Sequence, residues 1–280
     1  MKKNKFAFLF LIYGVLSFHY ALSQDLRDAD HTRKFAEYLF KTRQYVLASE
    51  EYERLVYFEP QNTEARLRLI QVYRFSGKYQ VALNRLEYFY YDSIQYLNQE
   101  FAKEYYKNLV LDKNNPKALD FLNKNINLDQ AYRQTHQLGT LLLEKQWDTA
   151  FYFALKHPVT NEKKNADLHA LAFRSKDAGY KKPFTAAIMS TIVPGTGKMY
   201  TKNWKDGFLS MMFVGVNTWQ AYRGFSKSGK NSVYGWVFAG LATGFYIGNI
   251  FGSHKSAKKY NKKIDDDLYN EAWHLVVDDF

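Results

Sequence analysis

The run Gly195-Thr196-Gly197-Lys198 resembles the end of a phosphate-binding P-loop. The complete motif needs glycine at position 192 and serine or threonine at position 199, where this chain has Ile192 and Met199. Both positions matter, because the backbone of the glycine-rich loop cradles the phosphates and the hydroxyl group binds Mg²⁺. No nucleotide-binding strand is expected before the run. The sequence therefore argues against nucleotide binding.

Other residues with catalytic or ligand chemistry are scattered. The seven histidines include no His-Glu-x-x-His pair, so a zinc site is not expected at His136, His157 or His169. The run Asp265-Asp266-Asp267 lacks the alternation of a calcium loop and is typical of an acidic first turn of a helix. The chain has no cysteine, which excludes disulfides, thiolate metal sites, a thiol nucleophile and a lipoprotein anchor. We predict no catalytic residue, no cofactor and no metal, and hence a protein that is not an enzyme.

Residues 1–23 have the pattern of a secretory signal peptide. Three lysines stand within the first five residues, an apolar run follows over residues 6–16, and Ala21 and Ser23 are small residues at the −3 and −1 positions of a cleavage site. The pattern predicts export and a mature chain that starts at Gln24. An uncleaved N-terminal anchor helix is the alternative, and it would export the following residues as well.

A 34-residue offset relates two parts of the following region. One set consists of Ala36, Leu39, Tyr45, Ala48, Tyr52, Leu55 and Pro60, and the shifted set of Ile70, Tyr73, Tyr79, Ala82, Leu86 and Phe89. Trp147 and Ala150 continue the pattern 68 residues after Tyr79 and Ala82. This period resembles that of the tetratricopeptide repeat (TPR), a helix-turn-helix unit. The resemblance implies an all-α, TPR-like stack of helical hairpins over residues 24–175.

Three details of that stack follow from particular residues. Ala48, Ala82 and Ala150 are expected where the second helix of a hairpin crosses the first closely, and Gly77 suits a left-handed residue after the first helix. At the third unit the equivalent positions hold Lys113 and Pro116, so we expect a degenerate hairpin or one broken by a loop. A generic stack of helical hairpins without TPR geometry is the alternative.

A stack of hairpins implies a concave groove that binds protein partners, because the first helix of each unit lines one face. The candidate groove residues are Arg33, Glu37, Tyr38, Arg66, Tyr73 and Arg74. Each of them could instead be a solvated or a packing residue.

Residues 181–263 form a separate basic region with 13 lysines and arginines and a single acid, Asp206. The basic residues flank three apolar runs, at about 184–194, 206–222 and 233–251, which favours an anionic lipid surface over nucleic acid. Only the third run approaches the roughly 20 residues that a spanning helix needs. Its glycines at positions 240, 244 and 248 predict a flat seam against the second run. A hairpin buried in a soluble domain is the alternative.

The start of the basic region carries a motif formed by Ser190, Pro194, Gly195, Gly197 and Tyr200, followed by Gly207 and, near the end of the region, Asn261. The motif resembles Ser-x-x-x-Pro-Gly-x-Gly-x-x-Tyr, the mark of a small bacterial membrane domain of unknown function in Bacteroidota envelope proteins. The usual glutamine after the second glycine is Lys198 here. The resemblance implies a membrane location and a helical hairpin, and it implies no activity.

Together these features predict an all-α, membrane-anchored adaptor or scaffold of the bacterial cell envelope. Its partners would be envelope proteins and membrane lipid, with no nucleic acid, and the repeat domain would be periplasmic. Residues 264–280 are expected to form a last, acidic helix that docks on the repeat domain or on a partner. The alternative functions are a structural subunit of an envelope membrane complex and, with no motif to support it, an envelope enzyme.

Overall fold

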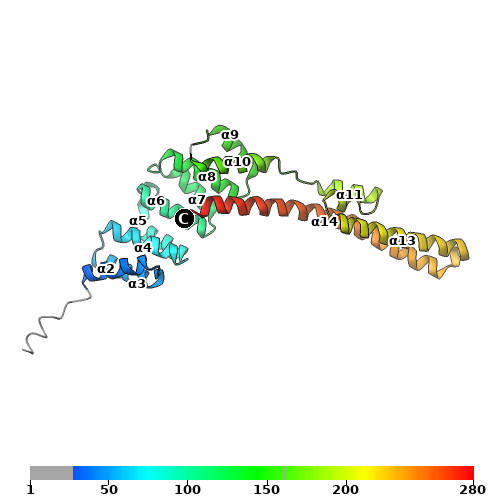
Figure 1. Ribbon diagram of the computed structural model, residues 1–280, viewed down its shortest axis with the longest axis horizontal. Helices are drawn as coiled ribbons and strands as arrows, with labels where there is room; N and C mark the ends of the chain where they lie inside the picture. Colours follow the sequence, from blue (N-terminus) through cyan, green and yellow to red (C-terminus); the bar gives the residue numbers. More distant parts are fainter. Residues whose placement is uncertain (1–27, 161) are drawn as a thin grey trace, which may run out of the picture. The chain divides into compact units, whose positions relative to one another are not determined.

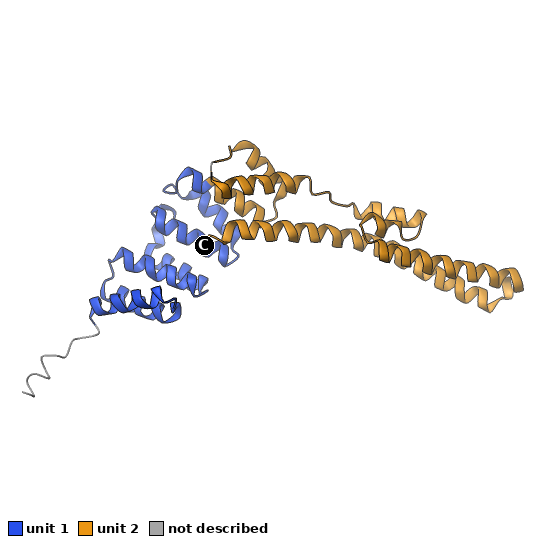
Figure 2. Cartoon of the chain, viewed as in Figure 1, with its two compact units in different colours: residues 1–133 blue, residues 134–280 orange. Residues whose placement is uncertain are grey.

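The computed structural model describes residues 28–160 and 162–280. Within these ranges every regular element is a helix and no strand occurs, which confirms the all-α prediction. The predicted signal peptide and the start of the mature chain at Gln24 lie outside the described residues. The chain divides into two compact units, residues 1–133 and 134–280 (Figure 2), and the boundary falls inside one helix, α8.

Unit 1 is a succession of antiparallel helical hairpins in which each helix contacts the next (Figure 1). Its elements are α2 (Ala29–Lys41), α3 (Tyr45–Phe58), α4 (Thr63–Phe75), α5 (Tyr79–Tyr90), the 3₁₀ helix η1 (Tyr91–Tyr96), α6 (Gln99–Leu111), α7 (Asn115–Lys124) and the start of α8 (Gln130–Leu143). Helical hairpins were predicted here, and the structure confirms them.

The first helix of each hairpin starts at a side-chain cap. Asp28, Asn62, Asn98 and Asp129 precede α2, α4, α6 and α8, and each accepts a hydrogen bond from the backbone N–H three residues later, at 2.7–3.1 Å. Such a cap satisfies one of the otherwise unpaired N–H groups of the first turn, and removing it costs about 1 kcal/mol. These four caps stand at the starts of the hairpins, and Asn114 also caps α7, the second helix of the third hairpin, by accepting the Lys117 N–H at 3.4 Å.

Each of these first helices ends at a residue in the left-handed conformation. Arg43, Gly77, Lys113 and Lys145 have φ angles between 55° and 74°. The residue after each of them donates its N–H to a carbonyl five residues earlier, for example Gln44 to Leu39 O at 2.9 Å. This is the Schellman termination of a helix. The predicted left-handed conformation of Gly77 is confirmed, and three residues with side chains adopt the same geometry.

Of the two expectations for the third unit, a degenerate hairpin or one broken by a loop, the broken hairpin is wrong. α6 and α7 form a complete hairpin, with Lys113 at its left-handed turn position and Pro116 in the first turn of α7, where proline is tolerated. The cap Asn98 follows Asn62 by 36 residues, because the segment that contains η1 is inserted before α6. A fixed offset of 34 therefore compares the wrong positions, and the small residue equivalent to Ala82 is Ala118.

The small residues at the helix crossings are buried. Ala48, Ala82, Ala118 and Ala150 all have no exposed surface. A methyl side chain lets two helix backbones approach closely, and the larger apolar residues fill the space around the crossing. In unit 1 that core includes Leu55, Leu69, Ile70, Leu86, Tyr105, Tyr106, Leu109 and Leu122.

Unit 2 holds the rest of α8 and a long helical hairpin. Its elements are α9 (Trp147–Lys156), α10 (Lys163–Lys176), α11 (Pro183–Ile192), α12 (Thr196–Tyr200), α13 (Trp204–Ser228), the 3₁₀ helix η2 (Gly229–Asn231) and α14 (Val233–Val277). α13 and the first part of α14 run side by side, joined at the tip by η2 (Figure 1). The second and third predicted apolar runs fall within α13 and α14, and the first, at about 184–194, extends two residues beyond the end of α11.

α14 is continuous over 45 residues. The separate acidic helix expected at 264–280 is therefore the end of α14, since no glycine or proline interrupts the chain between Ser253 and Phe280. Its docking on the preceding helical hairpins is observed within unit 2. Leu268, Ala272 and Val276 are buried there, and a Cβ on Gly139 of α8 would lie 2.7 Å from Val276 Cγ2.

Acidic residues of α14 surround that docked face. Asp265 accepts hydrogen bonds from Tyr180 Oη at 2.6 Å and Trp147 Nε1 at 3.0 Å, and Asp266 pairs with Lys145 at 3.0 Å. Glu271 forms an ion pair with Arg174. Burial raises the pKa of Tyr180, and the bond to Asp265 raises it further. Two of the three consecutive aspartates, Asp265 and Asp266, therefore take part in a packing contact.

Larger side chains at the helix crossings test whether the two helices of the third hairpin cross as closely as those of the second. Ala82→Leu and Ala118→Leu are each expected to lower the free energy of unfolding by about 1–3 kcal/mol, because the added carbons have no space at the crossing. Val81→Leu is the matched control, since Val81 is 40% exposed on the same helix as Ala82 and should change stability by less than about 0.5 kcal/mol. Urea unfolding of the full chain measures all three. An unchanged Ala118→Leu variant would contradict the register of the third hairpin.

Substitutions at the left-handed turn residues are expected to change the free energy of unfolding in opposite directions. Lys113→Gly is expected to raise the free energy of unfolding by about 0.5–1 kcal/mol, because glycine adopts φ of 59° without a steric penalty. Gly77→Ala should lower it by about 1 kcal/mol through the backbone alone, since a Cβ at Gly77 meets no atom within 4 Å. Thermal unfolding of both variants beside the parent measures the signs, and equal melting temperatures would contradict the turn geometry.

Candidate functional site

The residues of the Ser-Pro-Gly-Gly-Tyr motif come together where α11 and α12 meet α14. Ser190 has no exposed surface. Its Oγ accepts the backbone N–H of Gly197 at 3.0 Å and shares a 2.6 Å hydrogen bond with Ser253 Oγ of α14. Ser190 is therefore the polar centre of this junction. Ser253 was not singled out from the sequence, although it stands eight residues before Asn261.

Glycines allow the junction to close. A Cβ on Gly197 would lie 1.8 Å from the carbonyl oxygen of Ala186, and one on Gly195 would lie 2.0 Å from that of Gly207. Both clashes are with backbone atoms, which cannot move aside without shifting a helix. Gly195 also has a φ of 90°, which disfavours residues with a side chain. The motif glycines are thus required for the close approach of α11, α12 and α13.

The remaining motif residues complete the same junction. Val193, which precedes Pro194, is extended, as the residue before a proline prefers, and it ends α11. The side chain of Asn261 makes two hydrogen bonds to the backbone of Lys181. Its Nδ2 donates to the Lys181 carbonyl at 2.9 Å, and its Oδ1 accepts the Lys181 backbone N–H at 2.8 Å. The Lys181 ammonium lies 4.8 Å from the centre of the Tyr200 ring. All of these contacts are structural, and none presents a reactive group.

Beyond the junction the hairpin exposes large apolar side chains. Trp219 is 56% exposed and Trp236 is 62% exposed. The exposed set comprises Phe184, Ile188 and Ile192 of α11, Trp204, Phe208, Leu209, Met212, Phe213, Val216, Trp219 and Tyr222 of α13, and Val233, Tyr234, Trp236, Val237, Leu241, Phe245, Ile247 and Phe251 of α14. We call this set the apolar hairpin surface. A set of this size on three neighbouring helices is unusual for a soluble protein.

Basic residues lie at both ends of the apolar hairpin surface. Arg223, Lys227 and Lys230 are exposed beside the tip of the hairpin. At the other end the exposed cations are Lys202, Lys205, Lys255, Lys258, Lys259, Lys262 and Lys263. Cations that flank an apolar band suit the phosphate level of a lipid layer.

Among the described residues, no helix combines the length and the apolar character required to cross a membrane. The sequence had singled out residues 233–251 as the candidate for such a helix. Four glycines, Thr243 and Asn249 dilute the aliphatic side chains of that run.

The predicted glycine seam does not pack against α13. A Cβ added to Gly240, Gly244 or Gly248 would meet no atom within 4 Å. The close contact lies nearer the tip, where a Cβ on Gly224 would come within 2.7 Å of the Gly235 backbone. The expected position of the seam is therefore wrong, because the side-by-side run of the two helices turns a different face of α14 toward α13.

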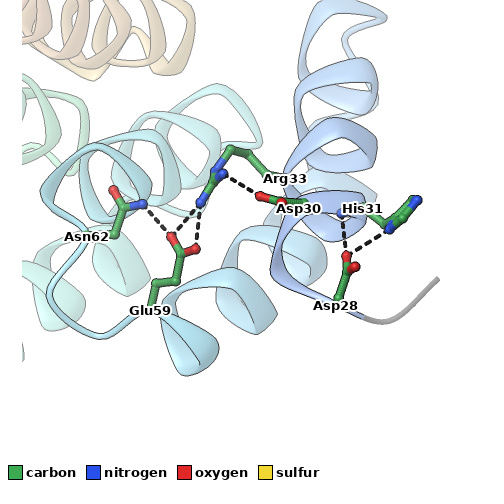
Figure 3. Close-up of polar contacts among 6 residues, drawn as sticks. All are labelled: Asp28, Asp30, His31, Arg33, Glu59 and Asn62. Atoms are coloured by element: carbon green, nitrogen blue, oxygen red, sulfur yellow. Dashed lines mark hydrogen bonds and ion pairs between the residues drawn. The ribbon is translucent and has the colours of Figure 1, made fainter. Parts of the chain in front are cut away.

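In unit 1 a cleft of about 350 Å³ lies between α2 and α4. Arg33 and Glu37, two of the predicted groove residues, line it, together with Phe40, Lys41, Tyr52, Leu55, Asn62, Glu64, Ala65 and Arg68. Arg33 is held at its edge (Figure 3), where it donates to Glu59 at 2.6 and 2.7 Å and to Asp30 at 3.0 Å. A hydrogen bond from Asn62 and the bonds from Arg33 lower the pKa of Glu59.

The other four predicted groove residues lie elsewhere. Tyr38 lines a second cleft, and the Arg66 guanidinium lies 4.9 Å from the centre of the Phe89 ring. Tyr73 donates to Glu53 at 2.6 Å, and burial raises its pKa. Arg74 is 6% exposed and pairs with Glu104 at 2.7 Å, so it joins α4 to α6 inside the unit.

Sequence reasoning missed Asn62 and Arg68 as lining residues of the cleft. The sequence could have indicated Asn62, because it stands 34 residues after the cap residue Asp28. No sequence feature indicated Arg68, because only the crossing of α2 and α4 determines which side of α4 faces the cleft.

No protein-family model matches this chain, and none of the curated proteins compared with it matches either. The two family resemblances noted from the sequence therefore stay predictions. Function has to be argued from the hairpin and the cleft themselves.

The junction predicts a large effect for a very small change. Gly197→Ala should lower the free energy of unfolding by about 1–3 kcal/mol, since its Cβ would strike the Ala186 carbonyl. Gly240→Ala is the matched control. It adds the same methyl group to open space on a helix, where alanine is favoured over glycine by about 1 kcal/mol. Circular dichroism melting in one detergent compares the two, and equal melting temperatures would contradict the close approach.

Proposed function

We propose that this protein is a membrane-associated adaptor of the bacterial cell envelope, which binds protein partners through its helical hairpins and contacts lipid through the apolar hairpin surface. The observation that carries the proposal is the exposure of that surface. It includes five aromatic residues on α13 alone: Trp204, Phe208, Phe213, Trp219 and Tyr222. Leaving so many large side chains in water is unfavourable, because each loses about 1.5–3 kcal/mol that full burial would provide.

The arrangement of charge supports lipid as the material that covers this surface. The exposed basic residues gather toward the two ends of the apolar band, at positions 223–230 and 255–263, and Lys205 stands between Trp204 and Phe208 at the start of α13. Exposed tryptophans stand beside them, at Trp204 near Lys205 and at Trp236 near Lys230, and Trp236 Nε1 donates to the Lys230 carbonyl at 2.9 Å. Tryptophan with neighbouring lysine is the usual combination at the polar boundary of a bilayer.

The cleft in unit 1 supports the binding half of the proposal. It brings Arg33, Arg68 and Lys41 together with Glu37 and Glu64 over an apolar floor that includes Leu55. Mixed charges above an apolar floor suit a peptide segment, because they offer hydrogen bonds to its backbone and side chains while the floor takes an apolar side chain. The signal peptide predicted for residues 1–23 supports placing this unit outside the cytoplasm.

A structural subunit of an envelope complex is the second candidate. In that case another protein covers the apolar hairpin surface. The open face at Gly240, Gly244 and Gly248 favours this candidate, since it would accept a helix at close range. The two candidates differ in what the purified chain binds by itself.

A single charge on the apolar hairpin surface tests the proposal. Leu241 is 44% exposed, so Leu241→Arg should leave the fold intact in water. In a lipid-embedded position arginine costs roughly 2.5–3.5 kcal/mol at full depth, which predicts that the variant leaves the membrane fraction. Carbonate extraction of cells that produce each variant measures this.

The control is Leu47→Arg, which introduces the same charge at a 50% exposed leucine of α3 in unit 1 and should not change the membrane fraction. Flotation of the purified protein with phosphatidylcholine vesicles separates the two candidates. A chain that floats by itself supports the adaptor. A chain that stays with the membrane in cells but does not float with vesicles supports the subunit, and one that carbonate removes in every form contradicts both.

A further inference from the structure

A small polar pocket interrupts the apolar hairpin surface. It has a volume of about 170 Å³ and lies between α12, α13 and α14. Lys198 and Ser210 line it together with Phe213, Phe245, Asn249 and two glycines. The rings of Phe213 and Phe245 stack at a centroid distance of 5.1 Å. The pocket therefore combines three polar side chains, Lys198, Ser210 and Asn249, with two stacked aromatic rings.

The charge in the pocket has no counter-ion. Lys198 Nζ donates to Ser210 Oγ at 2.7 Å, and Ser210 in turn donates to the Asp206 carbonyl at 2.7 Å. Among the described residues no carboxylate lies within ion-pair distance of Lys198. An ammonium carries three donors, and the serine uses one of them. Lys198 is thus able to bind an anion inside the pocket.

Asn249, which lines the same pocket, has an unsatisfied acceptor. Asn249 is 3% exposed, and its Oδ1 atom is buried without a hydrogen-bond partner. Its Nδ2 lies 3.5 Å from the Ser190 carbonyl oxygen, so the amide makes one long hydrogen bond. A buried acceptor left unpaired costs about 1–3 kcal/mol. A ligand that donates a hydrogen bond would remove that cost.

Glycines provide the space for the ligand. Gly244 and Gly248 line the pocket, and a Cβ on either would meet no atom within 4 Å. One turn further along α14, a Cβ on Gly252 would lie 3.2 Å from Lys198 Cε. The absence of side chains at these three positions lets the lysine chain lie along the helix and leaves the recess in front of it empty.

We propose that this pocket binds the headgroup of a phospholipid whose phosphate is joined to a hydrogen-bond donor. Lys198 neutralises the phosphate, and Asn249 accepts the hydrogen bond from the headgroup hydroxyl or ammonium. The inference rests on the proposed contact of the hairpin with lipid and adds a headgroup preference to it. A carboxylate ligand would satisfy Lys198 but would leave Asn249 unpaired, because an ionised carboxylate has no donor.

Native mass spectrometry of the full-length protein in detergent tests the pocket. Phosphatidylglycerol and phosphatidylethanolamine each supply a phosphate and a donor, whereas phosphatidylcholine supplies the phosphate alone. We expect the first two to bind more tightly than the third. Lys198→Gln should weaken their binding about tenfold or more, since a hydrogen bond to a charged group contributes roughly 1.5–3 kcal/mol.

Two further variants report on the rest of the pocket. Gly248→Leu should abolish the preference by filling the recess, and Asn249→Leu should make phosphatidylethanolamine bind no better than phosphatidylcholine. The matched controls are Gly240→Leu, on open space outside the pocket, and Lys258→Gln, which removes an exposed charge. Both should bind all three lipids as the parent does.

The outcomes separate this inference from the proposed function. A parent protein that floats with vesicles but binds the three lipids equally contradicts the headgroup site and leaves the adaptor proposal standing. A parent that fails to float contradicts the adaptor proposal itself. Glycerophosphoethanolamine, the soluble headgroup, is the remaining probe. If it binds as tightly as the lipid, the ligand is a free phosphodiester and the assignment to a lipid is overturned.

Discussion

The backbone contact between Gly197 and the Ala186 carbonyl is the constraint on which the arrangement of the hairpin depends. It brings the start of α12 against α11 at a distance that no side chain would permit. Ser190 can then accept the Gly197 amide and meet Ser253 of α14. Because α13 follows α12 after three residues, this contact also determines where the apolar face of α13 begins.

α14 extends the influence of that junction along unit 2. One half of this helix pairs with α13 and carries exposed apolar side chains, and the other half is docked through Leu268, Ala272 and Val276. Asp265 is bound by Tyr180 and Trp147 at the edge of the docked part. α14 therefore joins the apolar hairpin to the docked face as one uninterrupted helix.

The candidate sites show which functional residues could be predicted from residue type alone. Arg33 and Glu37 were predicted as groove residues and do line the cleft, whereas Arg74 has the same character in the sequence and is buried against Glu104. Nothing local distinguishes them, because the partner of Arg74 stands 30 residues away. Lys198 was noted only for departing from a familiar motif. Its role as the charge of a pocket depends on Asn249, which lies in another helix.

The helical class, the left-handed turn at Gly77 and the small residues at the helix crossings were predictable from the sequence alone. These features depend on local spacing and on which side chains a helix tolerates. Tertiary structure decided the third hairpin, because the segment that contains η1 shifted its register by two residues. It also decided that Gly240, Gly244 and Gly248 face open space, because the side of α14 that meets α13 is set by the junction at Gly197 and by the contact of Gly224 with Gly235. The spacing of apolar residues along the chain shows which side chains share one face of a helix. Only the packing of the helices determines what that face contacts.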